Sequence, residues 1–168
     1  MEYFSKAAQY APKARDKSVA GLLYDKMAIV YTALFDFDLS LNKTQMAATA
    51  YLEAGDSSYY ADELMRMLNT EIVLGRYDSA SMLVENIWKN KDRIDSVQLS
   101  SLYSNTLKIA TYTKNPHIDS IISGYRSTFI RNENLVDWLT VANAYCNSND
   151  YDKAEKTAVN WGLILQVW

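Results

Sequence analysis

The side chains most often used in catalysis are few in this sequence. His117 is the only histidine and Cys146 the only cysteine among 168 residues. A histidine that acts as a general base needs a nucleophile and an orienting acid within reach, and no motif here supplies that set. We interpret His117 as a surface residue at a helix start and Cys146 as a partly buried small residue. One histidine and one cysteine also exclude the usual zinc-binding spacings.

Two aspartates near the first third of the chain could also carry chemistry. Asp36 and Asp38 flank Phe37, so they could be read as paired acid and base carboxylates or as calcium ligands. A calcium-binding loop needs several further oxygen ligands at fixed spacing, and these are missing. We interpret both aspartates as residues of a turn and a helix start, where the helix dipole favours a negative charge.

Other classes of active site are equally unsupported by the sequence. It contains no phosphate-binding loop, no dinucleotide-binding fingerprint and no nucleophile elbow. Its 17 basic and 20 acidic residues give a net charge of -3, which disfavours nucleic-acid binding. One small basic cluster is interrupted by Asp92, so we interpret it as a solvated helix end; it consists of Lys89, Lys91 and Arg93. We therefore expect a protein that is not an enzyme, with no cofactor and no metal.

The spacing of the apolar residues predicts an all-α protein. Hydrophobic residues make up 49% of the chain, which is typical of a globular protein, and only 5 glycines and 2 prolines are present to punctuate β-turns. Apolar residues recur at steps of three and four, as in the run Leu23, Met27, Val30, Tyr31 and Leu34. Short polar breaks separate such runs. The pattern predicts about eight helices, in antiparallel pairs joined by tight turns.

Several helix boundaries have a physical cause in the sequence. Asp95 or Ser96 can cap the helix that follows. The pair Asn115-Pro116 ends one helix and begins the next, because proline disfavours helix at the residue before it. Gly75 lies where the chain leaves a helix, and we expect a left-handed backbone there.

The helix pairs form an internal repeat. In the copy that begins at Trp138, Val141-Ala142 and Tyr145 follow at offsets of 3, 4 and 7, and Tyr151 and Ala154 open the second helix. This copy resembles the tetratricopeptide repeat, whose first helix reads W-x2-L-G-x2-Y. Two further copies begin at Tyr24 and Leu64, whereas residues 97–130 match the pattern poorly.

The resemblance implies antiparallel helix pairs stacked as a right-handed α-solenoid that forms one domain over residues 1–168. We expect repeats near residues 21–56, 61–93, 97–130 and 135–168, with residues 1–16 as the end of a preceding helix. Solenoids need polar end caps, and the chain ends in the apolar run Trp161–Trp168. We therefore expect a part of a longer protein, or a homodimer formed through this apolar C-terminal helix.

In proteins of this family the first helices line a concave groove that takes a peptide or a helix. The resemblance implies that first-helix residues opposite the packing positions face this groove. The expected groove residues are Asp25, Ile29, Asp62, Met65, Asn69, Ile72, Leu139 and Asn143. Asp25 and Met65 stand where the family's clamp for acidic C-termini has basic residues, so that ligand is not expected.

The function that these observations predict is a non-enzymatic module that binds a protein or peptide in the groove. Two alternatives stay open at this point. The chain could be a ligand-sensing or regulatory segment of a larger signalling or transcription protein, or a helical-repeat carbohydrate-binding protein that stacks exposed tyrosines on sugars. We expect no nucleic-acid partner and no membrane insertion, because no apolar stretch approaches the roughly 20 residues that span a bilayer. The compartment stays open, with the cytoplasm favoured over the periplasm.

Overall fold

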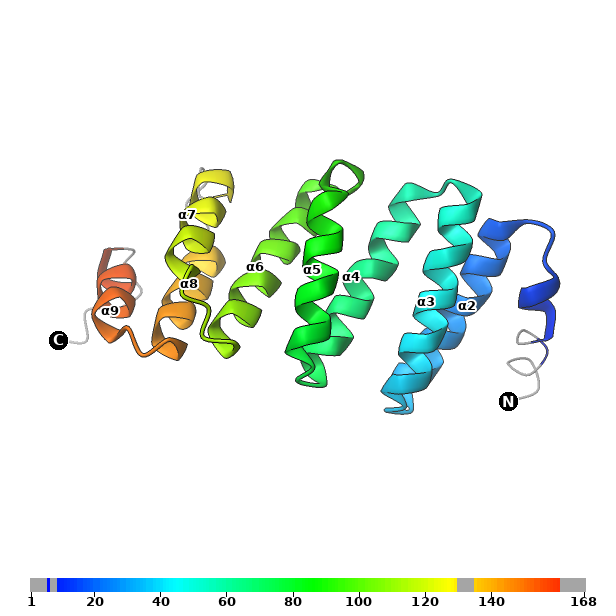
Figure 1. The fold of residues 1–168 in the computed structure, drawn as a ribbon, viewed down its shortest axis with the longest axis horizontal. Coiled ribbons are helices and arrows are strands. Elements are labelled where there is room, and N and C mark those ends of the chain that lie inside the picture. Colours follow the sequence, from blue (N-terminus) through cyan, green and yellow to red (C-terminus); the bar gives the residue numbers. More distant parts are fainter. Residues whose placement is uncertain (1–5, 7–8, 130–134, 161–168) are drawn as a thin grey trace. The chain divides into compact units, whose positions relative to one another are not determined.

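The computed structural model describes residues 6, 9–129 and 135–160, and within them every regular element is helical. The described part contains eight α-helices and two short 3-10 helices, and it has no strand (Figure 1). The helices are α2 (Lys17–Ala33), α3 (Phe37–Ala54), α4 (Ser57–Val73), α5 (Tyr77–Lys89), α6 (Ser96–Tyr112), α7 (Ile118–Phe129), α8 (Leu135–Asn147) and α9 (Tyr151–Asn160), with η1 (Ala11–Lys13) and η2 (Lys91–Arg93). The expected all-α class is confirmed.

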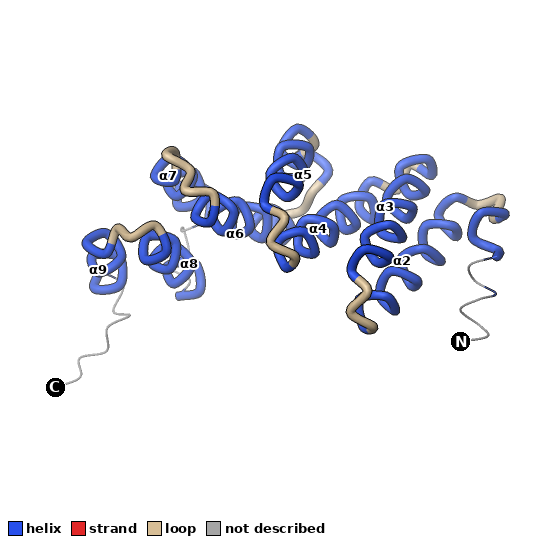
Figure 2. Tube along the Cα trace, turned by 60° about the horizontal axis from the view of Figure 1, so that its bottom comes forward, coloured by secondary structure: helices blue, strands red, loops and turns tan. Residues whose placement is uncertain are grey.

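The contacts within the chain divide it into two compact units, residues 1–98 and 99–168, where the sequence predicted a single domain. In the first unit α2 packs against α3, α3 against α4, and α4 against α5. In the second unit α8 packs against α9, and one apolar cluster joins α6, α7, α8 and α9. Short loops join most of these helices (Figure 2).

The helix pairs lie near the expected repeats. The pairs span 17–54, 57–89, 96–129 and 135–160. In the stretch 1–16, expected to end a preceding helix, the described residues Lys6, Gln9 and Tyr10 are α-helical and η1 is a single 3-10 turn. Ala11 is buried against α2 and α3. The apolar run 161–168, on which the expected homodimer depends, lies outside the described residues.

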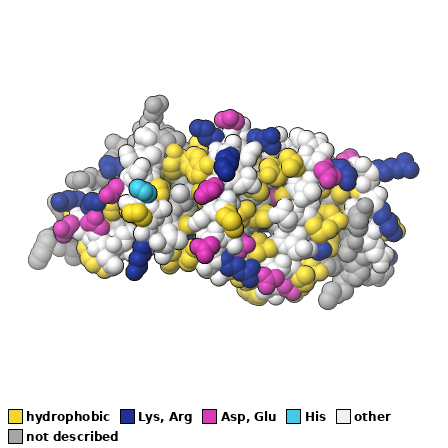
Figure 3. Space-filling model, in the orientation of Figure 1, with side chains coloured by type: hydrophobic (Ala, Val, Ile, Leu, Met, Phe, Trp, Pro, Cys, Tyr) yellow, Lys and Arg dark blue, Asp and Glu magenta, His cyan; other side chains and the backbone are white. Residues whose placement is uncertain are grey.

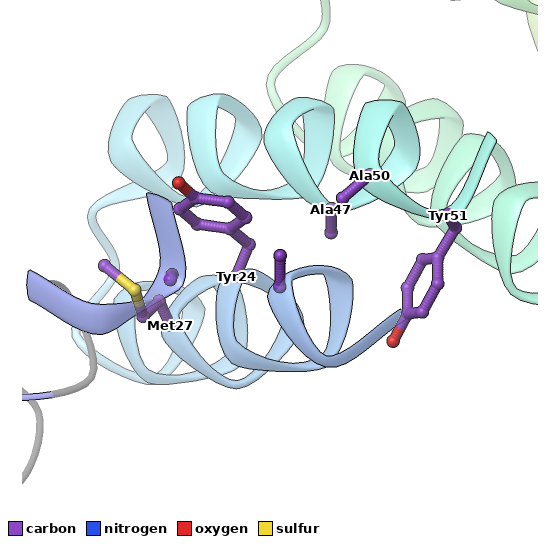
Figure 4. Close-up of a cluster of buried hydrophobic side chains, with 7 residues drawn as sticks. Tyr24, Met27, Ala47, Ala50 and Tyr51 are labelled. Carbon is purple, nitrogen blue, oxygen red and sulfur yellow. The ribbon is translucent and has the colours of Figure 1, made fainter. Parts of the chain in front are cut away.

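The core of the first unit depends on a close approach of α2 and α3. Tyr24 and Met27 of α2 pack with Ala47, Ala50 and Tyr51 of α3 (Figure 4). Gly21 makes this possible, because a Cβ atom there would lie 2.7 Å from the Tyr51 ring. That ring is 3% exposed and stacks on Tyr59 of α4 with 5.0 Å between the ring centroids, so it has little room to move.

The core of the second unit is built in the same way from one apolar face of each helix. Leu107 of α6 and Ile122 and Tyr125 of α7 pack with Val141 of α8 and Ala154 of α9. An ion pair between Lys153 Nζ and Asp119 Oδ2, 2.8 Å apart, also links α9 to α7. Tyr151, the first residue of α9, is 64% exposed, and its hydroxyl donates a hydrogen bond to Asn149.

Five interhelical turns share one backbone conformation. In each, a residue with a left-handed backbone is followed by a residue whose N–H donates to the carbonyl five positions earlier, which satisfies a free carbonyl of the helix end. The left-handed residues, with φ between 52° and 79°, are Phe35, Gly55, Gly75, Lys114 and Asn149. The hydrogen bonds, 2.8–3.0 Å long, run from Asp36 to Tyr31, Asp56 to Tyr51, Arg76 to Glu71, Asn115 to Ala110 and Asp150 to Tyr145. The left-handed backbone expected at Gly75 is confirmed.

These turns give the register of the repeat copy in residues 97–130, which matches the sequence pattern poorly. Phe35, Gly75 and Asn149 each lie eleven residues after Tyr24, Leu64 and Trp138. By the same count, Lys114 makes Tyr103 the first position of the remaining copy. The residue four positions further on is buried in every copy: Ala28, Leu68, Leu107 and Ala142.

The second helix of that copy explains its weak match. In the pairs α2–α3 and α4–α5, the residues 16 and 20 positions after the first position of the copy are buried. After Leu64, for example, these are Ala80 and Val84. In the third copy, helix α7 begins only at Ile118, and its buried residues Ile122 and Tyr125 lie 19 and 22 positions after Tyr103. The apolar face of α7 is therefore displaced by one residue along the sequence, after the turn at Asn115-Pro116.

Carboxylates cap several helix starts. Asp16 accepts hydrogen bonds from the N–H groups of Ser18 and Val19 at the start of α2. Asp36 caps α3 through the N–H of Leu39, and Asp38 lies in the first turn of α3, as interpreted from the sequence. Asp95 accepts from the N–H of Gln98 at 2.8 Å, and the Gln98 side chain accepts from the N–H of Asp95 at 3.0 Å. This reciprocal pair is a capping box.

The contact at Gly21 yields a prediction about stability. We expect Gly21→Ala to lower the free energy of unfolding by about 1–3 kcal/mol, because the added methyl group overpacks the buried Tyr51 ring. Gly124→Ala in α7 is the matched control, because its Cβ would lie 3.5 Å from Tyr103, an ordinary contact. This control should raise stability by about 0.5–1 kcal/mol, since alanine favours a helix over glycine. Urea denaturation measures both changes, and equal effects at the two sites would contradict this packing.

Candidate functional site

Each unit has a pocket between the first helices of its two pairs. In the first unit the pocket lies between α2 and α4, has a volume of about 520 Å³ and is here called the α2–α4 pocket. Its lining residues are Ile29, Thr32, Ala33, Phe37, Arg66, Asn69, Thr70 and Val73. The lining is mainly apolar, because its two threonine hydroxyls are already hydrogen-bonded within the protein. The Thr32 hydroxyl is bonded to Ala28 and Ser40, and the Thr70 hydroxyl is bonded to the Arg66 carbonyl, all within the protein.

The second unit has the corresponding α6–α8 pocket, with a volume of about 270 Å³. Its lining residues are Ser104, Asn105, Leu107, Lys108, Thr111, Thr140, Asn143, Ala144 and Asn147. Amide and hydroxyl side chains dominate this list. The side chains of Asn143 and Asn147 belong to exposed residues on α8. The second pocket is therefore the polar counterpart of the first.

Both pockets use the same positions of the repeat. Helices α4 and α8 contribute the residues two, five, six and nine positions after Leu64 and Trp138, the first positions of their copies. These residues are Arg66, Asn69, Thr70 and Val73 in α4, and Thr140, Asn143, Ala144 and Asn147 in α8. The preceding helix contributes the residues five and eight positions after Tyr24 or Tyr103, namely Ile29 and Thr32 or Lys108 and Thr111. Equal backbone turns and equal register thus place equivalent residues on equivalent surfaces.

A buried charge cluster lies beside the α2–α4 pocket. Arg66 donates a hydrogen bond to Asp25 of α2, and its Nη2 atom lies 3.7 Å from Glu63 Oε1. Asp25 and Glu63 are 6% and 2% exposed, whereas the Arg66 side chain is 32% exposed. The guanidinium therefore links buried carboxyl groups to the pocket wall. The cluster holds α2 and α4 together, and so fixes the pocket's opposite sides.

Burial within this cluster shifts two pKa values. Burial raises the pKa of Glu63 to about 7; Arg66 partly offsets this rise, and the neighbouring Asp25 adds to it. Burial, with the nearby charges of Asp25 and Glu63, also raises the pKa of Tyr51 to about 12. Oε2 of Glu63 accepts no hydrogen bond within the described part of the chain, which is consistent with a carboxyl group held protonated.

Exposed apolar residues occur in the lining of the α2–α4 pocket and next to it in the sequence. Ile29 and Val73 in its lining are 44% and 69% exposed, and Leu34 and Phe35, where α2 ends, are 63% and 79% exposed. On the face shown in Figure 3, hydrophobic side chains lie among acidic and basic ones. An open apolar pocket with one amide and one guanidinium at its wall can hold a large apolar side chain and donate hydrogen bonds beside it.

The expected groove residues divide into three groups. Ile29 and Asn69 line the α2–α4 pocket, and Asn143 lines the α6–α8 pocket. Asp62 and Leu139 are exposed but line neither pocket. The expectation was wrong for the remaining three, Asp25, Met65 and Ile72, which are buried and offer no surface to a partner.

The three buried residues have physical reasons for their position. Asp25 is drawn inward by Arg66, a contact between residues 41 positions apart that helix periodicity does not reveal. Met65 and Ile72 lie on the same face of α4, 6% and 7% exposed. Helix α4 is flanked by both α3 and α5, so its buried face is wider than that of a helix with a single neighbour.

The side chains singled out for chemistry are not assembled into a site. His117 is exposed at the start of α7 and visible in Figure 3. Cys146 is exposed, where the sequence predicted partial burial. Asp38 forms an ion pair with Arg76 at 2.8 Å. The described residues hold no group of three or more histidine, cysteine, aspartate or glutamate side chains that could bind a metal ion.

Comparisons with known proteins find no match for the chain among protein-family models, curated proteins or solved structures. No helix in the described part of the chain combines the length and the apolar character that crossing a bilayer requires.

The raised pKa of Glu63 yields a prediction about pH. The folded state keeps the Glu63 proton up to about pH 7, whereas the unfolded chain loses it near pH 4.5. The folded state therefore binds more protons across this interval, and stability falls as pH rises through it. We expect Glu63→Gln to be more stable than the wild type at pH 8 by about 1–3 kcal/mol, and the difference to vanish below pH 4.5.

The exposed Glu85 on α5 provides the control, because Glu85→Gln changes the same group without altering a buried carboxyl. Thermal and urea unfolding between pH 4 and 8 measure the effect. A Glu63→Gln variant that is less stable than the wild type at pH 8 would show that the ionised carboxylate contributes to folding.

Proposed function

We propose that this chain is a non-enzymatic interaction module in which the helix pairs form a right-handed tetratricopeptide-like solenoid. In this proposal the first helices line the binding surface, and the α2–α4 pocket holds an apolar side chain of a partner protein or peptide. The observation that carries the proposal is the open, mainly apolar pocket of about 520 Å³ between the first helices of neighbouring pairs.

The regular register supports the repeat part of the proposal. The left-handed turn residue follows the first packing position by eleven residues in all four helix pairs. The first positions are Tyr24, Leu64, Tyr103 and Trp138, so successive pairs begin 40, 39 and 35 residues apart. Each pair has a single hairpin turn of the same backbone form, as expected of stacked copies of one supersecondary unit.

The chemistry of the two pockets supports a peptide or protein as the ligand. The α2–α4 pocket offers apolar contact with Ile29, Phe37 and Val73, and Asn69 places an amide beside them. The α6–α8 pocket offers the amides of Asn143 and Asn147. Amide side chains can both donate to and accept from a peptide backbone, which suits a partner with alternating polar and apolar groups.

The two alternative functions have less support. Carbohydrate binding by stacking would call for exposed tyrosines beside a pocket. Tyr10, Tyr59, Tyr112 and Tyr151 are each more than half exposed, and none of them lines the α2–α4 or the α6–α8 pocket. A sensor or regulatory role is compatible with the same pockets, and no particular contact in the described residues favours it over partner binding.

A matched pair of substitutions tests the proposed function. Peptides that bind the wild-type chain are first selected from a displayed library of random 12-residue sequences. We expect Val73→Asp to lower the affinity for the selected peptides at least tenfold, because it places a charge in the apolar lining of the α2–α4 pocket. Isothermal titration calorimetry measures the affinities.

Val159→Asp is the control, because Val159 is 56% exposed near the end of α9 and lines neither pocket. It should bind the peptides as the wild type does, and circular dichroism should show equal helix content in both variants. If Val73→Asp and Val159→Asp bind equally well, or if no peptide is selected, the proposed function fails.

A further inference from the structure

Phe35 occupies a turn position whose left-handed backbone does not favour a phenylalanine, and its side chain is exposed. Its φ is 59°, in the left-handed region that disfavours bulky side chains. Equivalent turns place glycine at positions 55 and 75, and Lys114 and Asn149 in the other two. Asparagine and glycine tolerate this backbone best, and a bulky aromatic residue is a genuine outlier there. Phenylalanine therefore strains this turn, and glycine would remove the strain.

The contacts of the Phe35 side chain within the unit offset little of this strain. The residue is 79% exposed, the largest exposed fraction among the large hydrophobic residues described. Its one described ring contact is with Phe37, edge to face, with 6.2 Å between centroids and 78° between planes. Both the strained backbone and the exposed ring oppose stability. Such combinations are typical of residues retained for binding.

The position of Phe35 connects it to the pocket. Phe37, which the Phe35 ring contacts, is part of the α2–α4 pocket lining. Leu34, the residue before Phe35, is 63% exposed, and Val73 on the other side of the pocket is 69% exposed. Through its contact with Phe37, the exposed Phe35 ring adjoins one residue of the pocket lining at the turn of the α2–α3 hairpin.

The charges at this end of the hairpin are mainly acidic. Asp36 and Asp38 flank Phe37, and Arg76 bridges Asp38 at 2.8 Å and Glu71 at 3.9 Å. Asp36 takes no part in these pairs; its carboxylate accepts a hydrogen bond from the N–H of Leu39. Asp36, Asp38, Glu71 and Arg76 together carry a net charge of -2. An aromatic face in a region of net negative charge attracts a cation, because the ring quadrupole and the charge act in the same direction.

We propose that Phe35 is a docking anchor for a partner segment in which a large apolar residue is adjacent to lysine or arginine. The apolar residue occupies the α2–α4 pocket, and the cation lies against the Phe35 ring near Asp36 and Asp38. This inference deepens the proposed function, because it names the chemistry of a partner for that same pocket.

Two 14-residue fluorescein-labelled peptides test this inference by fluorescence anisotropy. One has leucine and lysine at helical spacing, and in the other glutamate replaces every lysine. We expect the lysine peptide to bind at least tenfold more tightly, with an affinity that falls as salt concentration rises. Phe35→Gly should lower the affinity for the lysine peptide at least fivefold, because it removes the ring. It should also raise the melting temperature by about 2–4 °C, because glycine adopts the left-handed backbone without strain.

Asn149→Gly is the matched control, because it makes the same backbone change at the equivalent turn and removes no aromatic ring. It should leave peptide affinity unchanged. The inference is overturned if the glutamate peptide binds as tightly, if Phe35→Gly binds like the wild type, or if Phe35→Gly lowers the melting temperature.

The Val73→Asp variant separates this inference from the proposed function. If Val73→Asp abolishes binding of the lysine peptide while Phe35→Gly has no effect, the pocket binds a partner and the role of Phe35 is wrong. If neither designed peptide binds the wild-type chain while library-selected peptides do, this inference fails and the proposed function stands. If Val73→Asp leaves the affinity of both the lysine peptide and the selected peptides unchanged, the pocket is not the binding site and both proposals fail.

Discussion

The hydrogen bond that closes each hairpin turn determines most of what this chain can do. In five turns the residue after a left-handed position donates its N–H to the carbonyl five residues earlier. This bond ends one helix and fixes where the next begins, so it also fixes which faces of the two helices meet. Because the turn lies eleven residues after the first packing position in all four pairs, each pair presents corresponding residues at corresponding places.

The two pockets follow from that regularity. Positions that point away from the hairpin core lie between the first helices of neighbouring pairs, and substitutions there change the chemistry without disturbing the packing. In the first unit these positions carry Ile29, Asn69 and Val73, and in the second unit they carry Lys108, Asn143 and Asn147. One helical framework thus supports an apolar surface and a polar one. The charge cluster at Asp25, Glu63 and Arg66 adds a fixed link between α2 and α4 in the first unit only.

Much of the local structure could be predicted from the sequence because its causes are local. Helix periodicity, the caps at Asp36 and Asp95 and the left-handed Gly75 all depend on residues a few positions apart. The left-handed backbones at Phe35 and Lys114 could not be predicted, because neither residue favours that conformation. The third copy shows its register only in the structure, where the left-handed Lys114 lies eleven residues after Tyr103.

The candidate site was less predictable because it depends on contacts between distant residues. Of the groove residues that the family resemblance implies, Ile29, Asn69 and Asn143 line pockets. The resemblance could not show that Asp25 pairs with Arg66 across 41 residues, nor that α4 buries Met65 and Ile72 between two neighbours. A charged residue on a helix face usually indicates solvent exposure, and a buried ion pair reverses that rule.

The most direct measurement of the central claim is a titration of the 15N-labelled chain with a selected peptide, followed by two-dimensional NMR. The account predicts that the largest chemical-shift changes include the backbone amides of Ile29 and Val73 and the side-chain amide of Asn69, which line one pocket. Changes confined to α3, α5 or other surfaces, with these three signals unmoved, would contradict the assignment of the α2–α4 pocket as the binding site.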